Sequence, residues 1–254
     1  MSYIIAFSGK GGTGKTTLAA LTVRYLNELQ GKPVLAVDAD SNSCFNEALG
    51  AKVSATIGGM REHSLESVRL GTRMAGMSTE EIFDYQVQQC IVEEKGYDLL
   101  AMGRPEGPGC YCAANNIIRK YTDKLADGYN YVVIDNEAGM EHLSRRTAHL
   151  VDLMFIVSDP TVKGIKTARR INDLIDELKL DIKNRYLIVN RVRGYENNEI
   201  QDAASKEGLQ IVGYIPNDDL IFQIDLAGKS VFNISKDSPA CSAFYGVLGN
   251  FIKA

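Results

Sequence analysis

The chain has 254 residues, of which 45% are hydrophobic and 24% are charged, a balance typical of a globular protein with a sizeable core. Lys and Arg number 28 and Asp and Glu number 32, so the formal net charge is -4, which disfavours proteins that coat DNA or membranes through a basic surface. No apolar run reaches the roughly 18 residues of a membrane span, and the N-terminus lacks the pattern of a signal peptide. We therefore expect a cytoplasmic protein.

Short apolar runs alternate with helical patterns along the chain. The first run, Tyr3–Phe7, predicts a strand buried on both faces, and helical spacing follows over Lys15–Leu29. A second buried strand is predicted at Pro33–Val37. Further strands are predicted at Asp98–Met102, Tyr129–Ile134, Leu153–Val157, Arg185–Val189 and Ile211–Tyr214, and helices at Thr161–Leu178 and Asn197–Lys206. This alternation predicts an α/β fold with a mainly parallel β-sheet flanked by helices on both faces, forming a single domain over residues 1–254.

Two regions depart from this alternation. Ala51–Glu94 holds no predicted strand, although Ser78–Ile91 has a helical pattern. Gly103–Gly109 is rich in glycine and proline and follows a predicted strand, which is where α/β sheets place ligand-binding loops. Near the C-terminus, an apolar helix face is expected to pack onto the domain. Its residues are Ala243, Phe244, Val247, Leu248, Phe251 and Ile252.

A glycine-rich loop joins the first predicted strand to the first helix. It reads Gly9-Lys10-Gly11-Gly12-Thr13-Gly14-Lys15-Thr16 and fits the phosphate-loop pattern G-x-x-x-x-G-K-[ST]. Backbone N–H groups in such a loop, together with the helix N-terminus, cradle phosphate oxygens. We expect Lys15 to neutralise the β- and γ-phosphates and Thr16 to bind Mg²⁺. The predicted phosphate-binding residues are Gly11, Gly12, Thr13, Gly14, Lys15, Thr16 and Thr17.

Two predicted strands end in carboxylates. Asp38-Ala39-Asp40 follows the second strand, so both carboxylates are expected near the phosphate loop. Val132-Val133-Ile134-Asp135 is an apolar strand that ends in Asp, the Walker B pattern, and we expect Asp135 to hold Mg²⁺.

The sequence K-G-G-x-G-K-T-T, from Lys10 to Thr17, resembles the deviant Walker A ATPases, the class that includes MinD, ParA, ArsA and the nitrogenase iron protein. In that class the early lysine reaches the nucleotide of a partner subunit. The resemblance implies a homodimer linked to ATP, in which Lys10 stabilises transition-state charge. It also implies that Asp40 polarises the attacking water and that Asp38 supports Mg²⁺ through water. The alternative for Lys10 is a solvated loop lysine, and the alternative for Asp40 is a helix N-cap.

Two later strand ends carry the polar residues expected at the base. Asn190 and Arg191 follow one predicted strand, and Pro216 and Asn217 follow the next. The resemblance implies that Asn190 reads the adenine edge and that the other three residues lie beside the base. As an alternative, either Asn caps the helix that follows it.

The Walker B strand continues as Asp135-Asn136-Glu137-Ala138-Gly139-Met140-Glu141-His142, where many relatives carry D-T-P-A-G. Glu137 thus stands in place of proline. The Asp-x-Glu-Ala-Gly-x-Glu-His run resembles the CooC-type maturation ATPases, which assist nickel insertion into carbon monoxide dehydrogenase. Gly139 would allow a switch loop to move, and His142 is expected to be structural rather than a metal ligand.

Five cysteines do not form a disulfide framework in a chain of this length. Cys44, Cys90 and Cys241 stand alone and are expected to be small buried hydrophobes. Cys110 and Cys112 are separated by one residue, so both sulfurs can reach one soft metal ion. CooC-type proteins have such a Cys-x-Cys motif, and a two-fold dimer would complete a four-cysteine site for Ni²⁺ or Zn²⁺. The alternative is a pair of packed or redox-sensitive thiols.

Together these features predict an ATP-hydrolysing metallochaperone that forms a homodimer with nucleotide or metal. Its client would be carbon monoxide dehydrogenase or acetyl-CoA synthase, and no nucleic acid or membrane partner is expected. One alternative is a positioning ATPase of the MinD or ParA kind, but only Lys253 lies near the C-terminal apolar face, whereas a membrane helix is basic. Another is an iron–sulfur reductase like the nitrogenase iron protein, whose cluster ligands are well separated in sequence.

Overall fold

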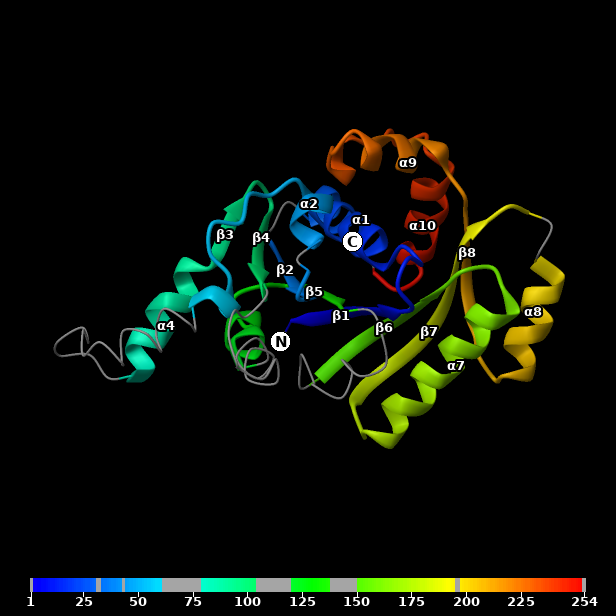
Figure 1. The fold of residues 1–254 in the computed structure, drawn as a ribbon, viewed down its shortest axis with the longest axis horizontal. Helices are drawn as coiled ribbons and strands as arrows, with labels where there is room; N and C mark the ends of the chain where they lie inside the picture. The colour runs from blue at the N-terminus through cyan, green and yellow to red at the C-terminus, as the bar shows by residue number, and fades with distance from the viewer. Residues whose placement is uncertain are drawn as a thin grey trace.

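A computed structural model describes residues 2–30, 33–42, 44–60, 79–103, 120–137, 150–194 and 197–252 (Figure 1). Its centre is an eight-stranded sheet of order β3-β4-β2-β5-β1-β6-β7-β8. The strands are β1 (Tyr3–Gly9), β2 (Val34–Ala39), β3 (Ile91–Glu94), β4 (Tyr97–Ala101), β5 (Tyr131–Asn136), β6 (Leu150–Ser158), β7 (Asp181–Val192) and β8 (Ile211–Pro216). Only β3 and β4 pair antiparallel in this sheet, so the prediction of a mainly parallel sheet is confirmed.

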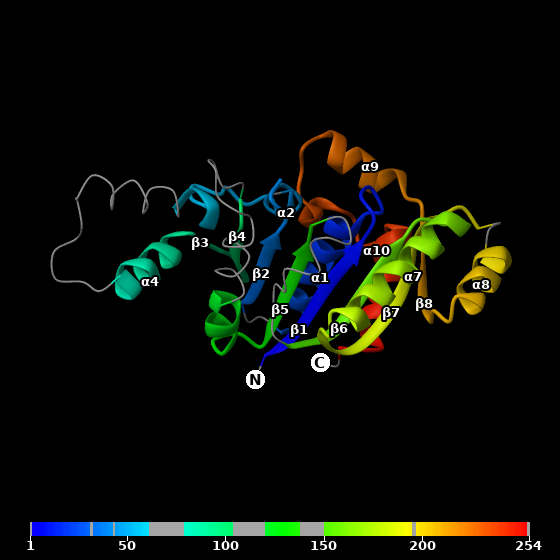
Figure 2. The same ribbon diagram turned by 60° about the horizontal axis from the view of Figure 1, so that its bottom comes forward.

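Helices cover both faces of the sheet. They are α1 (Lys15–Gln30), α2 (Phe45–Leu49), α4 (Thr79–Gln89), α7 (Val162–Glu177), α8 (Asn197–Lys206), α9 (Asp219–Leu226) and α10 (Pro239–Gly249), with a 3-10 turn η1 (Val231–Asn233). The buried side chains of α1, α2 and α10 share one hydrophobic cluster, and those of α4, α7 and α8 share the other. Figure 2 shows α7 in front of β6 and β7, with α1 and α10 behind the strands.

Strand alternation decides which face each polar residue at a strand end occupies. In β2, Val34 and Ala36 belong to the cluster that contains α1, and Leu35 and Val37 belong to the cluster that contains α7. Because side chains alternate with a period of two, the next residue, Asp38, lies on the α1 face. This is the face onto which the loop after β1 leads, because that loop continues directly into α1.

The segment Ala51–Glu94 does contain a strand, which corrects the prediction that it holds none. Ile91–Glu94 forms the edge strand β3, paired with β4 through a tight hairpin. Gly96 in that hairpin has φ +91°, a left-handed conformation that favours glycine in two-residue turns. The strand escaped sequence analysis because its four residues are half-buried or exposed and end in two glutamates. The predicted helix in this segment is confirmed as α4.

The C-terminal apolar face packs onto the domain as expected. Phe244 and Leu248 of α10 are completely buried, and Val247 is buried beside them. Helix α9 was not predicted, and none of its residues is buried. Among the described residues, no helix has both the length and the apolar character needed to cross a membrane.

A candidate nucleotide site at the carboxyl ends of the strands

Strand order brings the predicted phosphate and magnesium residues together. β5 lies between β2 and β1 in the sheet, and all three run parallel. Asp135 of β5 is the register partner of both Asp38 on β2 and Phe7 on β1. The glycine-rich loop leaves the sheet two residues after Phe7. The carboxyl ends of parallel strands are the usual ligand-binding edge of an α/β sheet, and here they hold the loop and both carboxylates.

Two glycines of the loop have left-handed backbones. Gly12 has φ +80° and Gly14 has φ +90°. A side chain at Gly12 would meet nothing within 4 Å, whereas a Cβ at Gly14 would lie 2.4 Å from Asn190 Nδ2. The backbone between them is held by Thr13, whose hydroxyl donates to the carbonyl oxygen of Lys10 at 2.8 Å. The loop is thus open at Gly12 and tightly packed at Gly14.

The two lysines of the loop differ in exposure. Lys15 is 6% exposed, and its Nζ lies 3.5 Å from the carbonyl oxygen of Lys10. Burial lowers the pKa of Lys15, and the nearby carboxylates of Asp135 and Asp40 oppose that shift. A desolvated ammonium at the mouth of a glycine loop is well placed to bind phosphate oxygens. Lys10, in the same loop, is exposed.

The carboxylates at the ends of β2 and β5 are both buried. Asp38 is 0% exposed and Asp135 is 1% exposed. Burial, reinforced by the neighbouring Asp135, raises the pKa of Asp38 to about 8, and burial raises the pKa of Asp135 to about 6. A hydrogen bond between the Thr16 side chain and Asp135 lowers the pKa of Asp135 and so offsets part of the effect of burial.

One carboxylate oxygen of Asp135 lacks a hydrogen-bond partner among the described residues. Among the described residues, Asp135 Oδ1 is buried and has no hydrogen bond, which is costly for an ionised carboxylate. A divalent cation with oxygen ligands would satisfy it. Thr16 and Asp135 therefore fit Mg²⁺, and the buried Asp38 beside them fits a supporting position.

Asp40 lies at the edge of this group and is half-buried. Its Oδ1 accepts hydrogen bonds from the backbone N–H of Asn42 at 2.8 Å and from Asn42 Nδ2 at 3.1 Å. The helix-capping role offered as the alternative for Asp40 belongs instead to Asp38. Asp38 Oδ2 accepts from the N–H of Phe45, the first residue of α2, at 3.1 Å.

The predicted base residues line one cavity of about 350 Å³ beside the loop. Asn190 Nδ2 donates to the carbonyl oxygen of Thr13 at 2.8 Å, and Asn190 Oδ1 accepts from the N–H of Arg191 at 3.0 Å. Asn190 therefore joins the base cavity to the phosphate loop, a role that sequence analysis did not foresee. The lining residues are Gly14, Thr17, Leu18, Asn190, Arg191, Pro216, Asn217, Asp218, Ile221, Phe222 and Asp225.

Two further features of this cavity were missed from the sequence. Arg191 has φ +62°, a left-handed conformation that is uncommon outside glycine and clusters at functional sites. Helix α9 supplies Ile221, Phe222 and Asp225 to the cavity. The cap of α9 is Asp218, whose Oδ1 accepts from the N–H of Leu220 at 2.9 Å, so the capping alternative for Asn217 is wrong.

Comparison with known proteins identifies the family of this chain. Residues 4–231 match the family model of the CobQ/CobB/MinD/ParA nucleotide binding domain. The chain belongs to this family. An uncharacterized ATP-binding protein of Methanocaldococcus jannaschii is 41% identical to this chain over 92% of both chains. The carbon monoxide dehydrogenase accessory protein CooC of Rhodospirillum rubrum is 33% identical, covering 93% of this chain and 91% of its own.

Solved structures show the same fold. MinD of Pyrococcus horikoshii, complexed with Mg-ADP, has a TM-score of 0.70 and 22% identity and covers 100% of this chain and 97% of its own. A ParA family ATPase of Chlorobium tepidum has a TM-score of 0.74 and 20% identity, covering 97% of this chain and 98% of its own. This protein is therefore a nucleotide-binding ATPase of the MinD/ParA class by family and by fold.

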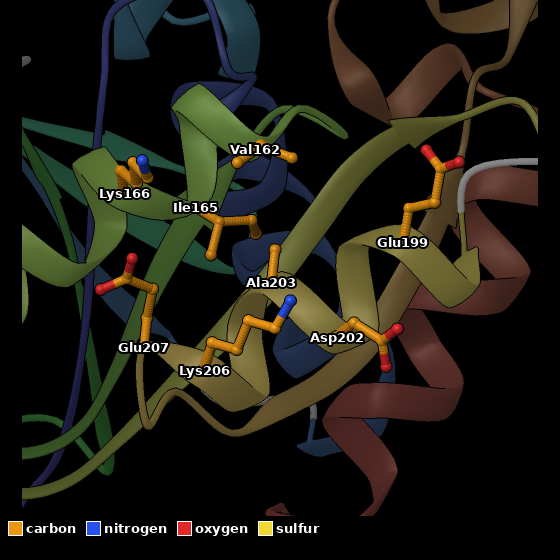
Figure 3. A pocket seen from close by; sticks show the side chains of 8 residues that line it. All are labelled: Val162, Ile165, Lys166, Glu199, Asp202, Ala203, Lys206 and Glu207. Atoms are coloured by element: carbon orange, nitrogen blue, oxygen red, sulfur yellow. The ribbon is translucent and has the colours of Figure 1, made fainter.

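A second cavity of this MinD/ParA-class protein, of about 500 Å³, lies between α7 and α8. Ile165 of α7 and Ala203 of α8 lie toward one another there, and charged side chains surround them (Figure 3). None of its lining residues comes from the glycine loop or from the carboxyl ends of β1, β2 and β5. This cavity is separate from the nucleotide site.

The predicted thiol site of this ATPase lies outside the described residues, as do Cys110, Cys112, Gly139 and His142. Within the described ranges, no cluster of three or more His, Cys, Asp and Glu side chains is arranged to hold a metal ion. Cys90 and Cys241 are buried, as expected for small hydrophobes, but Cys44 is exposed, which corrects that expectation.

Two residues that follow the Walker B carboxylate contact neighbouring segments. Asn136 Nδ2 donates to the carbonyl oxygen of Phe7 at 2.9 Å, joining the end of β5 to β1 just before the loop. Glu137 Oε1 accepts a hydrogen bond from Ser41 Oγ at 3.1 Å. Sequence analysis assigned neither contact, because both partners are distant in the chain.

Proposed function

We propose that this protein is an ATP-hydrolysing metallochaperone that assists nickel insertion into carbon monoxide dehydrogenase or acetyl-CoA synthase. The observation that carries the metallochaperone role is the similarity to CooC, named as an accessory protein of carbon monoxide dehydrogenase, over 93% of this chain. The hydrolytic role is supported by a buried lysine, two buried carboxylates and a base cavity around one glycine loop.

In this proposal each side chain of the site has one task. Lys15 and the backbone N–H groups of residues 11–14 bind the phosphates, and Asn190, with the other residues of the base cavity, holds the adenine. Mg²⁺ held by Thr16 and Asp135, and supported through water by Asp38, would neutralise charge on the phosphate oxygens. Asp40 orients the water that attacks the γ-phosphate, and hydrolysis yields ADP and phosphate.

The proposed active form is a homodimer. Lys10 is exposed in the loop, in contrast to the buried Lys15, so it is available to a second subunit. In the dimer, Lys10 of each subunit stabilises the charge that develops on the nucleotide of the other. ATP binding and dimer formation are then linked, because each favours the other.

The proposed cargo ion, Ni²⁺ or Zn²⁺, binds the thiolates of Cys110 and Cys112 from both subunits. The chain reaches these residues from β4, whose end is joined to the nucleotide site. The N–H of Met102 donates to the carbonyl oxygen of Asp38 at 2.8 Å. This backbone contact supports a link between the segment that carries Cys110 and Cys112 and the carboxylates that hold Mg²⁺. Through this link, ATP hydrolysis would release the cargo ion.

The runner-up function, a MinD-like positioning ATPase on a membrane, has less support. MinD of Bacillus subtilis is 24% identical over 90% of this chain. A C-terminal membrane helix would need its apolar face free, but Phe244 and Leu248 of α10 are completely buried. A DNA-bound ParA-like role would need a basic surface, and the net charge is -4.

Metal analysis together with mass measurement in solution tests the proposal. With ATP and Ni²⁺ or Zn²⁺, the protein should be a dimer that holds about one ion per pair of subunits. Cys110→Ala with Cys112→Ala should lose the ion and keep ATP binding, whereas the control Cys44→Ala, at an exposed cysteine outside the motif, should keep the ion. An unchanged metal content in the double variant, or a monomer in every nucleotide state, would refute the metallochaperone.

A further inference from the structure

The loops that follow β2 and β5 are joined by one side-chain hydrogen bond, from Ser41 Oγ to Glu137 Oε1 at 3.1 Å. Ser41 is the residue directly after Asp40, and Glu137 is the second residue after Asp135. Ala39 and Asn136 are register partners at the ends of the two strands, so the bond joins the two loops immediately beyond the sheet. It spans 96 positions of the chain.

We propose that Glu137, acting through Ser41, is a positioning residue that sets the place of Asp40 for ATP hydrolysis. This inference rests on the proposed role of Asp40 at the attacking water. Glu137 does not touch the reacting atoms in this scheme. It holds the neighbour of Asp40 at a fixed place relative to β5, the strand that carries the Mg²⁺ ligand Asp135.

The other contacts of Asp40 do not provide that reference point. Its N–H donates to Asp38 Oδ1 at 3.0 Å, and its carboxylate accepts from Asn42. The first contact ties Asp40 to the end of β2 and the second lies within the loop, and neither involves a residue of β5. The Ser41–Glu137 bond relates the loop to the neighbouring strand end.

The residue type at position 137 matters for this bond. A proline at this point, as in the D-T-P-A-G motif, would have no side-chain acceptor. A glutamate offers carboxylate oxygens to the Ser41 hydroxyl, and a charge-assisted bond of this kind is stronger than a neutral one. The Asp-x-Glu form of the motif therefore supplies an anchor that the proline form lacks.

The expected effect is on turnover rather than on binding. Phosphate and base are held by the glycine loop and by the cavity at β7 and β8, which neither Ser41 nor Glu137 lines. A small displacement of the residue that orients water lowers the rate of the chemical step without weakening substrate binding. Loss of the bond should therefore lower kcat and leave KM for ATP almost unchanged.

The experiment is a double-mutant cycle on the full-length protein, read out as steady-state ATP hydrolysis and thermal unfolding. Ser41→Ala and Glu137→Ala should each lower kcat about tenfold, with KM within about twofold of wild type. The double variant should be no worse than either single variant, because both remove the same bond. Ser41→Thr and Glu137→Gln keep a hydroxyl and an acceptor and should retain most of the activity.

Two controls separate positioning from folding. The unfolding temperature of all five variants should equal that of wild type. Ser235→Ala removes a comparable exposed contact, 3.3 Å from Asp237 Oδ2, and should leave kcat unchanged. Additive losses in the double variant, or a Glu137→Gln enzyme as slow as Glu137→Ala, would overturn the positioning role.

Asp40→Asn distinguishes this inference from the proposed function. If Asp40→Asn abolishes hydrolysis while Ser41→Ala and Glu137→Ala keep wild-type kcat, the positioning role is wrong and the role of Asp40 stands. If Asp40→Asn keeps wild-type kcat, or the wild-type protein does not hydrolyse ATP, both the catalytic scheme and the positioning role fail.

Discussion

Asp38 and Asp135 lie side by side as register partners on the parallel strands β2 and β5, and both are buried on the face covered by α1. Two adjacent buried carboxylates repel one another and lose hydration, which raises the pKa of each. The ammonium of Lys15 is a counter-charge that lowers the pKa of Asp135. The site is therefore short of positive charge until a cation binds.

The first prediction concerns pH. Both folded-state pKa values, about 8 for Asp38 and about 6 for Asp135, exceed the unfolded value of about 3.9. Between these limits the folded state binds more protons than the unfolded chain, so the stabilisation is present below about pH 4 and lost as the pH rises through about 6 and then 8. Without Mg²⁺ and nucleotide, the free energy of unfolding should fall over this range. Urea unfolding in EDTA measures it.

The control for the pH prediction is Asp38→Asn, which removes the group with the larger shift. Its free energy of unfolding should decline less steeply with pH than that of wild type. Saturating Mg²⁺ and ADP should also flatten the decline, because a cation favours the ionised carboxylates. A wild-type stability that increases from about pH 5 to 8 in EDTA would contradict the assignment.

The second prediction compares two glycines of the loop. Gly12→Ala and Gly14→Ala both place a side chain on a left-handed backbone, which costs about 1 kcal/mol or more. Only Gly14→Ala also brings a Cβ within 2.4 Å of Asn190 Nδ2. Gly14→Ala should therefore lose more stability in urea unfolding, and adding Asn190→Ala should recover part of the difference. Equal losses of stability for the two glycine variants would show that the Asn190 side chain moves aside at no cost.

The third prediction separates the two roles of Asn190. Asn190→Ala should weaken ATP binding about tenfold, because it removes the bond to the carbonyl oxygen of Thr13 and alters the base cavity. If the bond to the loop matters, inorganic tripolyphosphate, which has no base, should also bind more weakly. Calorimetry with both ligands tests this. Unchanged tripolyphosphate binding would mean that Asn190 acts at the base alone.

The fourth prediction concerns the C-terminal helix. Phe244 is completely buried, with its ring centroid 6.3 Å from that of Phe7, so Phe244→Ala should cost about 3–5 kcal/mol of stability. Phe222 of α9 is 65% exposed, and its removal should cost less than about 1 kcal/mol.

Wild-type protein should not sediment with anionic liposomes. Liposome binding that is lost with α10 substitutions would instead indicate a membrane helix.

Local patterns were enough to predict the fold and the placement of the glycine loop beside the two buried carboxylates. Apolar runs such as Val132–Ile134 indicated strands buried on both faces, and the glycine loop between strand and helix indicated α1 and its anion-binding end. Asp38 and Asp135 were assigned together because the carboxyl ends of parallel strands share one edge.

Sequence analysis missed contacts between residues that are distant in the chain. The bond from Asn190 to Thr13 and the bond from Ser41 to Glu137 join residues 177 and 96 positions apart, and no local pattern encodes such pairs. Helix α9 was missed because it has only eight residues and none of them is buried. Asp40 was offered as a helix cap, but the N–H of Phe45 donates to Asp38, which lies within β2.

The bond between Asn190 and Thr13 joins two parts of the site that are distant in the chain. The phosphate side of the site is built by the first part of the chain and the base side by the last part, with β6 between them in the sheet. A nucleotide bound as proposed would contact both parts and link them across the sheet. Nucleotide occupancy should therefore make the two parts unfold together, as one cooperative unit, in calorimetric melting.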